Sequence, residues 1–426
     1  LQKLLAEASE QGDIKKVKAL LDTNKVNSDS QTSREGIGKG PLHIACTYGQ
    51  TEIVEELLMS GADPTARTHT GRTPLHDVCV GGHLQCLKLL LKFTDNVNVQ
   101  SWDGQTPAHL AAFNGEITCL QLLTNRGANL MMRDNKGKQA SHMAAMRNHK
   151  KLLEFFFDHG VDMDAQCAIG KTPAHYAAQH GALDFLTLLI QRDCDITIVD
   201  KNGYLAAHHA ARHDKLDCFR FLVKQGTALD ATQSDGKTPT HVAALYGSIN
   251  VLHWLLEKGT DPNNQDYSGY TSGHFAAEGG HPNCLHCFLM HEGQLDILNA
   301  KGDSLSDTAK KAGHAILMEK SVTNEEPCPH CYELYKKQEW EKKHKLTLLE
   351  RNISIATSSA FRNPLPPVPN TPTQQRMKLT ELKHQINKEK GWRVNLPTRD
   401  LTTKYFGQYL DPNALFMYKT RNGFRH

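Results

Sequence analysis

Eight histidines stand at a constant interval of 33 residues along the first three-quarters of the chain. They are His43, His76, His109, His142, His175, His208, His241 and His274. A fixed period of about 20 to 50 residues is typical of stacked-repeat proteins, because one repeat cannot bury its apolar face alone and must pack against its neighbours. The period therefore predicts a solenoid instead of a single closed core.

The residues around each histidine predict a pair of short helices. In Thr106-Pro107-Ala108-His109 the threonine suits an N-cap, since its hydroxyl can accept from an otherwise unpaired amide, and the proline suits the first helical position. Six residues after each histidine stands a glycine, asparagine or aspartate, which tolerate the positive φ that a helix C-terminus often requires. Cys119, Leu120 and Leu123 then form the apolar stripe of a second helix.

The Thr-Pro-x-His phrase, repeated at this period and followed by a pair of small residues, resembles the ankyrin repeat. The resemblance covers residues 1–320. It implies an all-α ankyrin-repeat solenoid in which each 33 residues form a helix-turn-helix and a hairpin. It also implies a non-enzymatic scaffold or adaptor for protein–protein interaction, because the concave face of such a stack is a binding surface.

The ends of the period give the expected domain boundaries. Residues 1–35, which lack the Thr-Pro phrase, are expected to form an N-terminal capping repeat and a connection. Eight full repeats would occupy residues 36–299, and a C-terminal capping repeat, in which Asp307 replaces the histidine, residues 300–322. Residues 323–426 carry 18 Lys and Arg against 10 Asp and Glu, although the net charge of the chain is only +3. They predict a basic, partly disordered tail with short helices.

Composition narrows the compartment and the class of partner. The 11 cysteines do not suggest a disulfide framework, which favours reduced thiols and a cytoplasmic or nuclear protein. No apolar stretch approaches the roughly 18 residues of a membrane span, and no signal-like segment stands at the start. The chain begins at Leu1 without a methionine, so it is left open whether a further segment precedes it in a longer protein. The lysine-rich runs lack a nucleic-acid-binding motif, and we expect a monomer that binds no nucleic acid.

In the ankyrin family the partner-contacting positions lie beside the hairpin glycine and four and five residues after the histidine. On this chain these positions are rich in aromatic and cationic side chains, and Tyr, Trp and Arg are the residue types enriched at binding hot spots. The expected partner is an elongated protein with acidic and apolar groups. The expected partner-binding residues are Tyr48, Arg72, Trp102, Phe113, Arg147, Tyr204, Arg212, Tyr246, Tyr267 and Tyr270.

Metal and cofactor sites are not expected. The eight repeat histidines should bond neighbouring backbone and hydroxyl groups, as they do in the family. Cys328-Pro329-His330-Cys331 supplies half of a zinc site, and His344 is a candidate third ligand, but no further ligand follows at the short spacing of a zinc finger. The same four residues lack the strand and helix context of a thiol oxidoreductase. No phosphate-binding glycine loop or nucleophile–base pair indicates an enzyme.

Residues 370–426 suggest an alternative function. Leu379, Leu382 and Ile386 form an apolar stripe, and Leu396-Pro397 follows. This order is similar to that of a SOCS box, which recruits a cullin ubiquitin ligase through elongin. Lys383 stands where a cysteine is expected, and the Leu-Pro element is single. The alternative is a substrate receptor of a cullin ligase, whereas the simpler interpretation is a tail that engages a second partner.

Overall fold

The computed structural model describes residues 2–22, 38–315 and 328–331 of the chain. They belong to one compact unit, Leu1–Glu339, while the second unit, Trp340–His426, lies outside the described residues. Within the described ranges every regular element is an α-helix, and the helices repeat in pairs. This confirms the predicted all-α solenoid.

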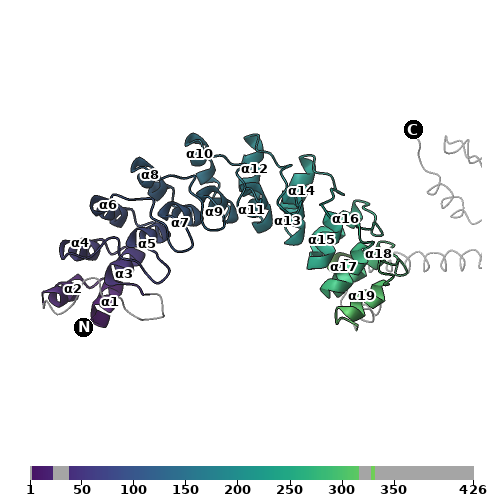
Figure 1. Ribbon diagram of the computed structural model, residues 1–426, viewed down its shortest axis with the longest axis horizontal. Coiled ribbons are helices and arrows are strands. Elements are labelled where there is room, and N and C mark those ends of the chain that lie inside the picture. Colours follow the sequence, from purple (N-terminus) through teal and green to yellow (C-terminus); the bar gives the residue numbers. More distant parts are fainter. Residues whose placement is uncertain (1, 23–37, 316–327, 332–426) are drawn as a thin grey trace, which may run out of the picture. The chain divides into compact units, whose positions relative to one another are not determined.

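Inner and outer helices alternate along the chain and form two layers (Figure 1). The inner helices are α1 (Gln2–Gln11), α3 (Pro41–Tyr48), α5 (Pro74–Gly81), α7 (Pro107–Asn114), α9 (Ala140–Met146), α11 (Pro173–His180), α13 (Ala206–Arg212), α15 (Pro239–Tyr246), α17 (Ser272–Gly279) and α19 (Leu305–Lys311). The outer helices are α2 (Ile14–Leu21), α4 (Thr51–Met59), α6 (Leu84–Phe93), α8 (Ile117–Asn125), α10 (Lys151–Asp158), α12 (Leu183–Gln191), α14 (Leu216–Lys224), α16 (Ile249–Glu257) and α18 (Pro282–Met290). Inner helices pack on inner helices of the neighbouring pairs, and outer helices on outer helices. In Figure 1 the inner helices follow the shorter side of the arc.

The inner helices of the repeats with the Thr-Pro phrase begin as the sequence predicts. At α7 the Thr106 hydroxyl accepts from the backbone N–H of His109, and Nδ1 of the His109 ring accepts from the backbone N–H of Thr106 at 3.1 Å. The ring's Nε2 donates to the carbonyl of Lys138 in the next hairpin at 2.9 Å. One histidine therefore caps the N-terminus of its own helix and also connects two neighbouring repeats by a hydrogen bond.

The helix ends also match the prediction. The residue six positions after each repeat histidine has positive φ in every repeat. Gly115, for example, caps α7 at φ 82°, and the two positions without glycine, Asn148 and Asp214, adopt φ 59° and 53°. Asparagine and aspartate visit this left-handed region more readily than other residues with a side chain.

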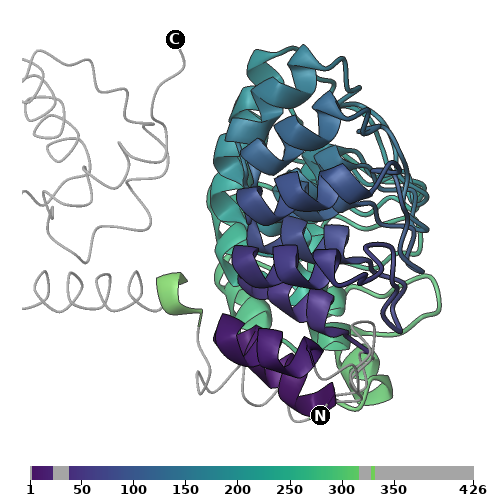
Figure 2. The ribbon, with the colours of Figure 1, turned by 90° about the vertical axis from the view of Figure 1, so that its left-hand side faces the viewer.

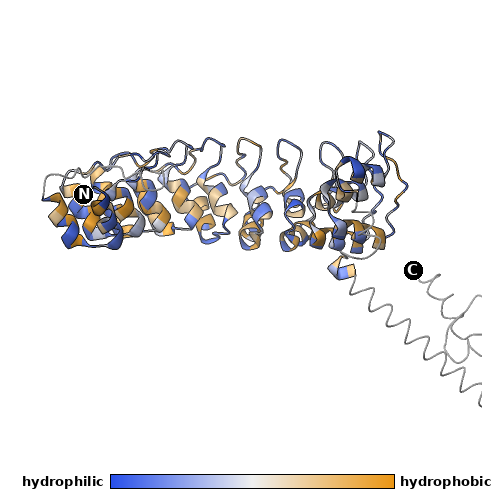
Figure 3. Ribbon diagram, turned by 90° about the horizontal axis from the view of Figure 1, so that it is seen from below, coloured by the Kyte–Doolittle hydropathy of each residue, from blue (hydrophilic) through white to orange (hydrophobic). Residues whose placement is uncertain are grey.

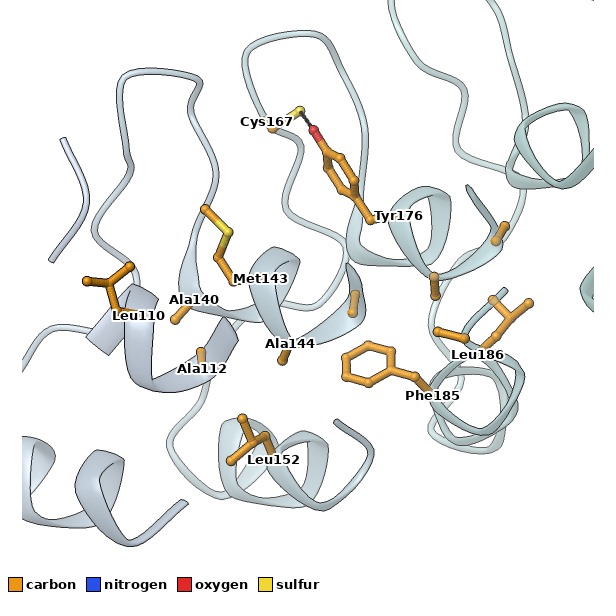
Figure 4. Packing of buried hydrophobic residues seen from close by; sticks show 14 of the residues in the cluster. Leu110, Ala112, Ala140, Met143, Ala144, Leu152, Cys167, Tyr176, Phe185 and Leu186 are labelled. Atoms are coloured by element: carbon orange, nitrogen blue, oxygen red, sulfur yellow. Dashed lines mark hydrogen bonds between the residues drawn. The ribbon is translucent and has the colours of Figure 1, made fainter. Parts of the chain in front are cut away.

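The core lies between the two helix layers. Phe156, Phe185, Phe219 and Phe288 of the outer helices are fully buried. Figure 4 shows Phe185 pointing toward the inner helix that carries Ala144, whose small side chain leaves room for the ring. Apolar residues follow the helices, whereas the hairpins are mostly hydrophilic (Figure 3). The buried phenylalanines thus fasten each outer helix to the inner layer.

The hairpins lie together along one edge of the array (Figures 2 and 3). Successive hairpins are linked by backbone hydrogen bonds, such as Trp102 N–H to the Thr70 carbonyl at 3.0 Å and Asn135 N–H to the Asp103 carbonyl at 3.0 Å. The hairpins form a continuous border beside the inner helices. Among the residues that the structure describes, the helices are too short or too polar to cross a membrane.

Candidate functional site

The inner surface, made of the inner helices and the hairpins, carries all ten expected partner-binding residues. Tyr48, Arg212 and Tyr246 end α3, α13 and α15, Phe113 lies in α7, Arg147 follows α9, and Arg72, Trp102, Tyr204, Tyr267 and Tyr270 lie in hairpins. The Tyr267 and Trp102 side chains are 77% and 61% exposed, and Tyr48 and Tyr246 are exposed as well. Tyr204 and Tyr270 are only half-exposed, because their rings pack on His209 and Phe275. The four exposed residues are therefore more accessible to a partner than Tyr204 and Tyr270.

Three of the exposed or half-exposed rings on this surface have a guanidinium above them. Arg147 lies 4.4 Å from the Phe113 ring centre, and Arg212 lies 4.2 Å from that of Tyr246. Arg67 lies 4.9 Å from the Trp102 ring centre and also donates to the carbonyls of Gly71 and Gln100. These cation–π contacts restrict the motion of both side chains. They present flat, positively charged faces that need little further ordering to bind a partner.

A hollow opens where α5, α7 and α9 meet their hairpins. Its volume is about 420 Å³, and Arg72 and Phe113, both expected from the sequence, line it. Val80, Met143 and Met146 give it an apolar wall. Asp103, Asp134 and Lys136 are among its other lining residues, so the hollow combines an apolar wall with charges of both signs.

Cations follow the inner surface from the second to the sixth repeat. This cationic strip consists of Arg72, Lys136, Lys138, Arg147, Lys171 and Arg212. The ammonium groups of Lys138 and Lys171 lie 4.9 and 5.5 Å from the centre of the Tyr176 ring, and burial lowers the pKa of both. Among the residues that the structure describes, no member of the strip forms an ion pair. Asp134 and Asp200 attract Lys138 and Lys171 at longer range, so the strip is positive overall but not isolated from carboxylates.

The repeat histidines are structural groups. At His76, Nδ1 accepts from the backbone N–H of Thr73 at 3.1 Å and Nε2 donates to the Gln105 carbonyl at 2.9 Å. Burial lowers the pKa of His76 to about 4, so the ring is neutral at physiological pH. With both nitrogens used, the ring has no lone pair to give to a metal.

A second constellation lies on the outer helices near the end of the array. Cys328 and Cys331 meet His253 of α16 and Cys287 of α18, and the ligand atoms of the four side chains all lie within 4.8 Å of one another. All four residues are buried. The sequence-based expectation of no metal rested on the lack of further ligands at short spacing. The array supplies two ligands, 44 and 78 positions away from Cys331, so that reason no longer holds.

A sequence signal for His253 exists in the repeat register. At the position of His253 the preceding outer helices have Glu55, Lys88, Gln121, Glu154, Thr187 and Arg220. Those side chains are exposed or half-exposed, whereas His253 is 7% exposed. A buried histidine in this column of solvent-facing residues marks a face that something else covers, and the same position one repeat later is again a buried histidine, His286, directly before Cys287. His344, Leu379, Leu382, Lys383, Ile386 and Leu396-Pro397, expected as further ligand or SOCS-like elements, lie outside the described residues.

Comparison with protein families identifies the repeats. A family model described as ankyrin repeats (3 copies) matches residues 2–68, 42–134, 126–200 and 186–266. Together these overlapping stretches cover more than half of the chain.

Proposed function

The chain belongs to the ankyrin-repeat family, a module for protein–protein interaction, and we propose that it is a scaffold that binds one extended partner along its inner surface. Ankyrin repeats are in general non-catalytic, so the repeat unit acts through binding. The observation that carries the proposal is the cationic strip, whose members form no ion pair within 4.0 Å among the described residues and run beside exposed aromatic rings.

The partner should alternate acidic groups with apolar anchors. Lys138 and Lys171 occupy equivalent positions in successive repeats, so an elongated chain with repeated Asp or Glu residues can meet both. Both ammonium groups are already partly desolvated in the free protein. Binding an acidic partner therefore removes less of their hydration, which favours such a partner. An apolar side chain would enter the hollow beside Phe113, and another would pack on Trp102.

A displayed random-peptide library selected on the full-length chain tests this proposal. Selected peptides should be enriched in Asp or Glu alternating with large apolar residues. In the double variant Trp102→Ala/Tyr246→Ala their affinity should fall at least ~30-fold, since a buried aromatic hot spot contributes about 2 kcal/mol or more. The melting temperature should stay within about 2 °C, because both residues lie at the surface and not in the core.

The matched control changes cations on the outer helices. Lys88→Ala/Lys151→Ala alters two exposed lysines of α6 and α10 and should leave the affinity unchanged. Arg147→Ala/Arg212→Ala should slow association and weaken its salt dependence. Equal losses in the outer and inner variants, or peptides without acidic enrichment, would show that the surface was misplaced. Capture of elongin by the full chain, lost on deletion of residues 370–426, would favour the ligase-receptor alternative.

A further inference from the structure

The four side chains His253, Cys287, Cys328 and Cys331 converge on one point. The Cys331 and Cys287 sulfurs are 3.7 Å apart. Nδ1 of His253 lies 3.7 Å from Cys287 Sγ, 4.0 Å from Cys328 Sγ and 3.4 Å from Cys331 Sγ. We propose that these four residues bind one zinc ion, which fastens the segment 328–331 to α16 and α18.

The distances suit tetrahedral coordination. Zinc–sulfur and zinc–nitrogen bonds of about 2.3 and 2.0 Å at tetrahedral angles separate two sulfurs by about 3.8 Å and a sulfur from a nitrogen by about 3.5 Å. The sulfur–sulfur distance matches this value, and the three sulfur–nitrogen distances scatter around theirs. A disulfide would require sulfurs about 2.05 Å apart, far closer than Cys287 and Cys331.

The chemistry of the donor set selects zinc. Three thiols and one imidazole form a ligand set common in structural zinc sites, and soft sulfur ligands disfavour magnesium and calcium. The exposed fractions are 0% for Cys287 and Cys328, 3% for Cys331 and 7% for His253. Four protein ligands in a closed site leave no open position for water or substrate. The ion would therefore be structural and not catalytic.

Neighbouring groups hold the ligands in place. The backbone N–H of Cys328 donates to Nδ1 of His286 at 3.2 Å. His330, between the two cysteines, stacks on the His253 ring at 4.9 Å, and its Nε2 is 2.9 Å from Oδ1 of Asn250. Such supporting contacts orient the ligands of metal sites and are usual around them. They come from α16 and α18, so the site is built on two adjacent repeats.

The ion would stabilise the end of the array. Its ligands close a loop of about 40 residues between Cys287 and Cys328, which contains α19. The terminal helix α19 packs on α17 on one side and lacks a following repeat among the described residues. Because metal binding to such a site contributes directly to folding, zinc would serve as part of the C-terminal cap.

Metal analysis of the full-length chain, purified without chelators, tests the proposal. We expect about one zinc per chain, and after exchange into Co²⁺ the visible spectrum of a tetrahedral cobalt–thiolate site. The double variant Cys328→Ser/Cys331→Ser should lose at least nine-tenths of the metal while the repeat helices stay folded by circular dichroism. His253→Cys should keep the metal, because it replaces the imidazole by a fourth thiolate, and four thiolates also bind structural zinc.

Two matched controls separate the site from its surroundings. Cys284→Ala changes a buried cysteine of α18, the helix that carries Cys287. Cys284 is not in the cluster, so this variant should leave the metal content unchanged. His291→Ala tests the next histidine, whose Nε2 is 3.9 Å from Cys331 Sγ, and should also retain zinc. Zinc absent from the intact chain with no Co²⁺ uptake, zinc retained in Cys287→Ala, or a Cys328–Cys331 disulfide in freshly purified protein would each overturn the proposal.

Discussion

At the scale of single residues, two adjacent buried histidines show how differently the same side chain can serve this fold. His208 bonds on both sides: Nδ1 accepts from the Leu205 N–H at 3.2 Å, and Nε2 donates to the Ala231 carbonyl at 2.9 Å. The His209 ring makes one hydrogen bond, from Nε2 to Asp200 at 2.9 Å, and its Nδ1 is buried without a hydrogen-bond partner. Burial lowers the pKa of His209 despite the carboxylate, so the ring donates as a neutral group.

We expect substitution of these histidines by methionine to have different consequences. His208→Met should lower the free energy of unfolding by about 2 kcal/mol or more, since it leaves a backbone N–H and a carbonyl unpaired. His209→Met should cost less than His208→Met, because Met143 already stands beside Asp134 at the same positions of another repeat and Asp200 keeps the N–H groups of Asn202 and Tyr204. Urea unfolding followed by circular dichroism measures both. Equal losses would mean that the Asp200 contact matters as much as the inter-repeat bridge.

At the scale of elements, α13 has a weaker start than its neighbours. Its N-cap is Leu205, which lacks the hydroxyl that Thr172 and Thr238 place against His175 and His241. The Leu205 backbone is already extended at φ −76° and ψ 164°, the conformation of the threonine caps. We expect Leu205→Thr to stabilise the protein by about 0.5–1 kcal/mol, since a threonine cap satisfies one more amide.

The reverse change supplies the comparison. Thr238→Val removes only the hydroxyl at the start of α15 and should cost about 1 kcal/mol. Thermal unfolding of the two variants beside the parent chain gives both values. If Leu205→Thr is neutral while Thr238→Val destabilises, the apolar contacts of Leu205 outweigh the missing cap.

The helix pairs themselves could be predicted from the sequence because their determinants are local. Threonine caps, the glycines at positive φ and the apolar stripes each act within a few residues, so the 33-residue period exposes them repeatedly. His253 departs from its repeat register, but the cluster that it forms could not be predicted, because Cys328 and Cys331 are distant in sequence and obey no repeat. Tyr204 and Tyr270 fit the family contact positions, yet their burial depends on His209 and Phe275, which the contact rule does not consider.

At the scale of the whole molecule, the repeat histidines make stability depend on pH. Burial lowers the pKa of all eight, and for four of them the value is about 4: His76, His142, His175 and His208. A free histidine titrates near pH 6.5, so the unfolded chain binds more protons than the folded chain between these values. The folded state is therefore fully stable above about pH 7 and loses stability as the pH falls from about 6.5 toward about 4.

Because the same group recurs along the array, the losses should accumulate. Each of the four strongly shifted histidines should lower the free energy of unfolding by about 2 kcal/mol at about pH 5 relative to about pH 7.5. This value holds if unfolding exposes the ring fully to water. We expect the thermal midpoint to be flat from about pH 8 to 7 and to fall steeply below about 6.5. The fall should persist at high salt, since desolvation of a buried ring is not screened, whereas repulsion between surface charges is. A midpoint that stays constant down to about pH 4.5, or a fall that salt abolishes, would refute the buried-histidine explanation.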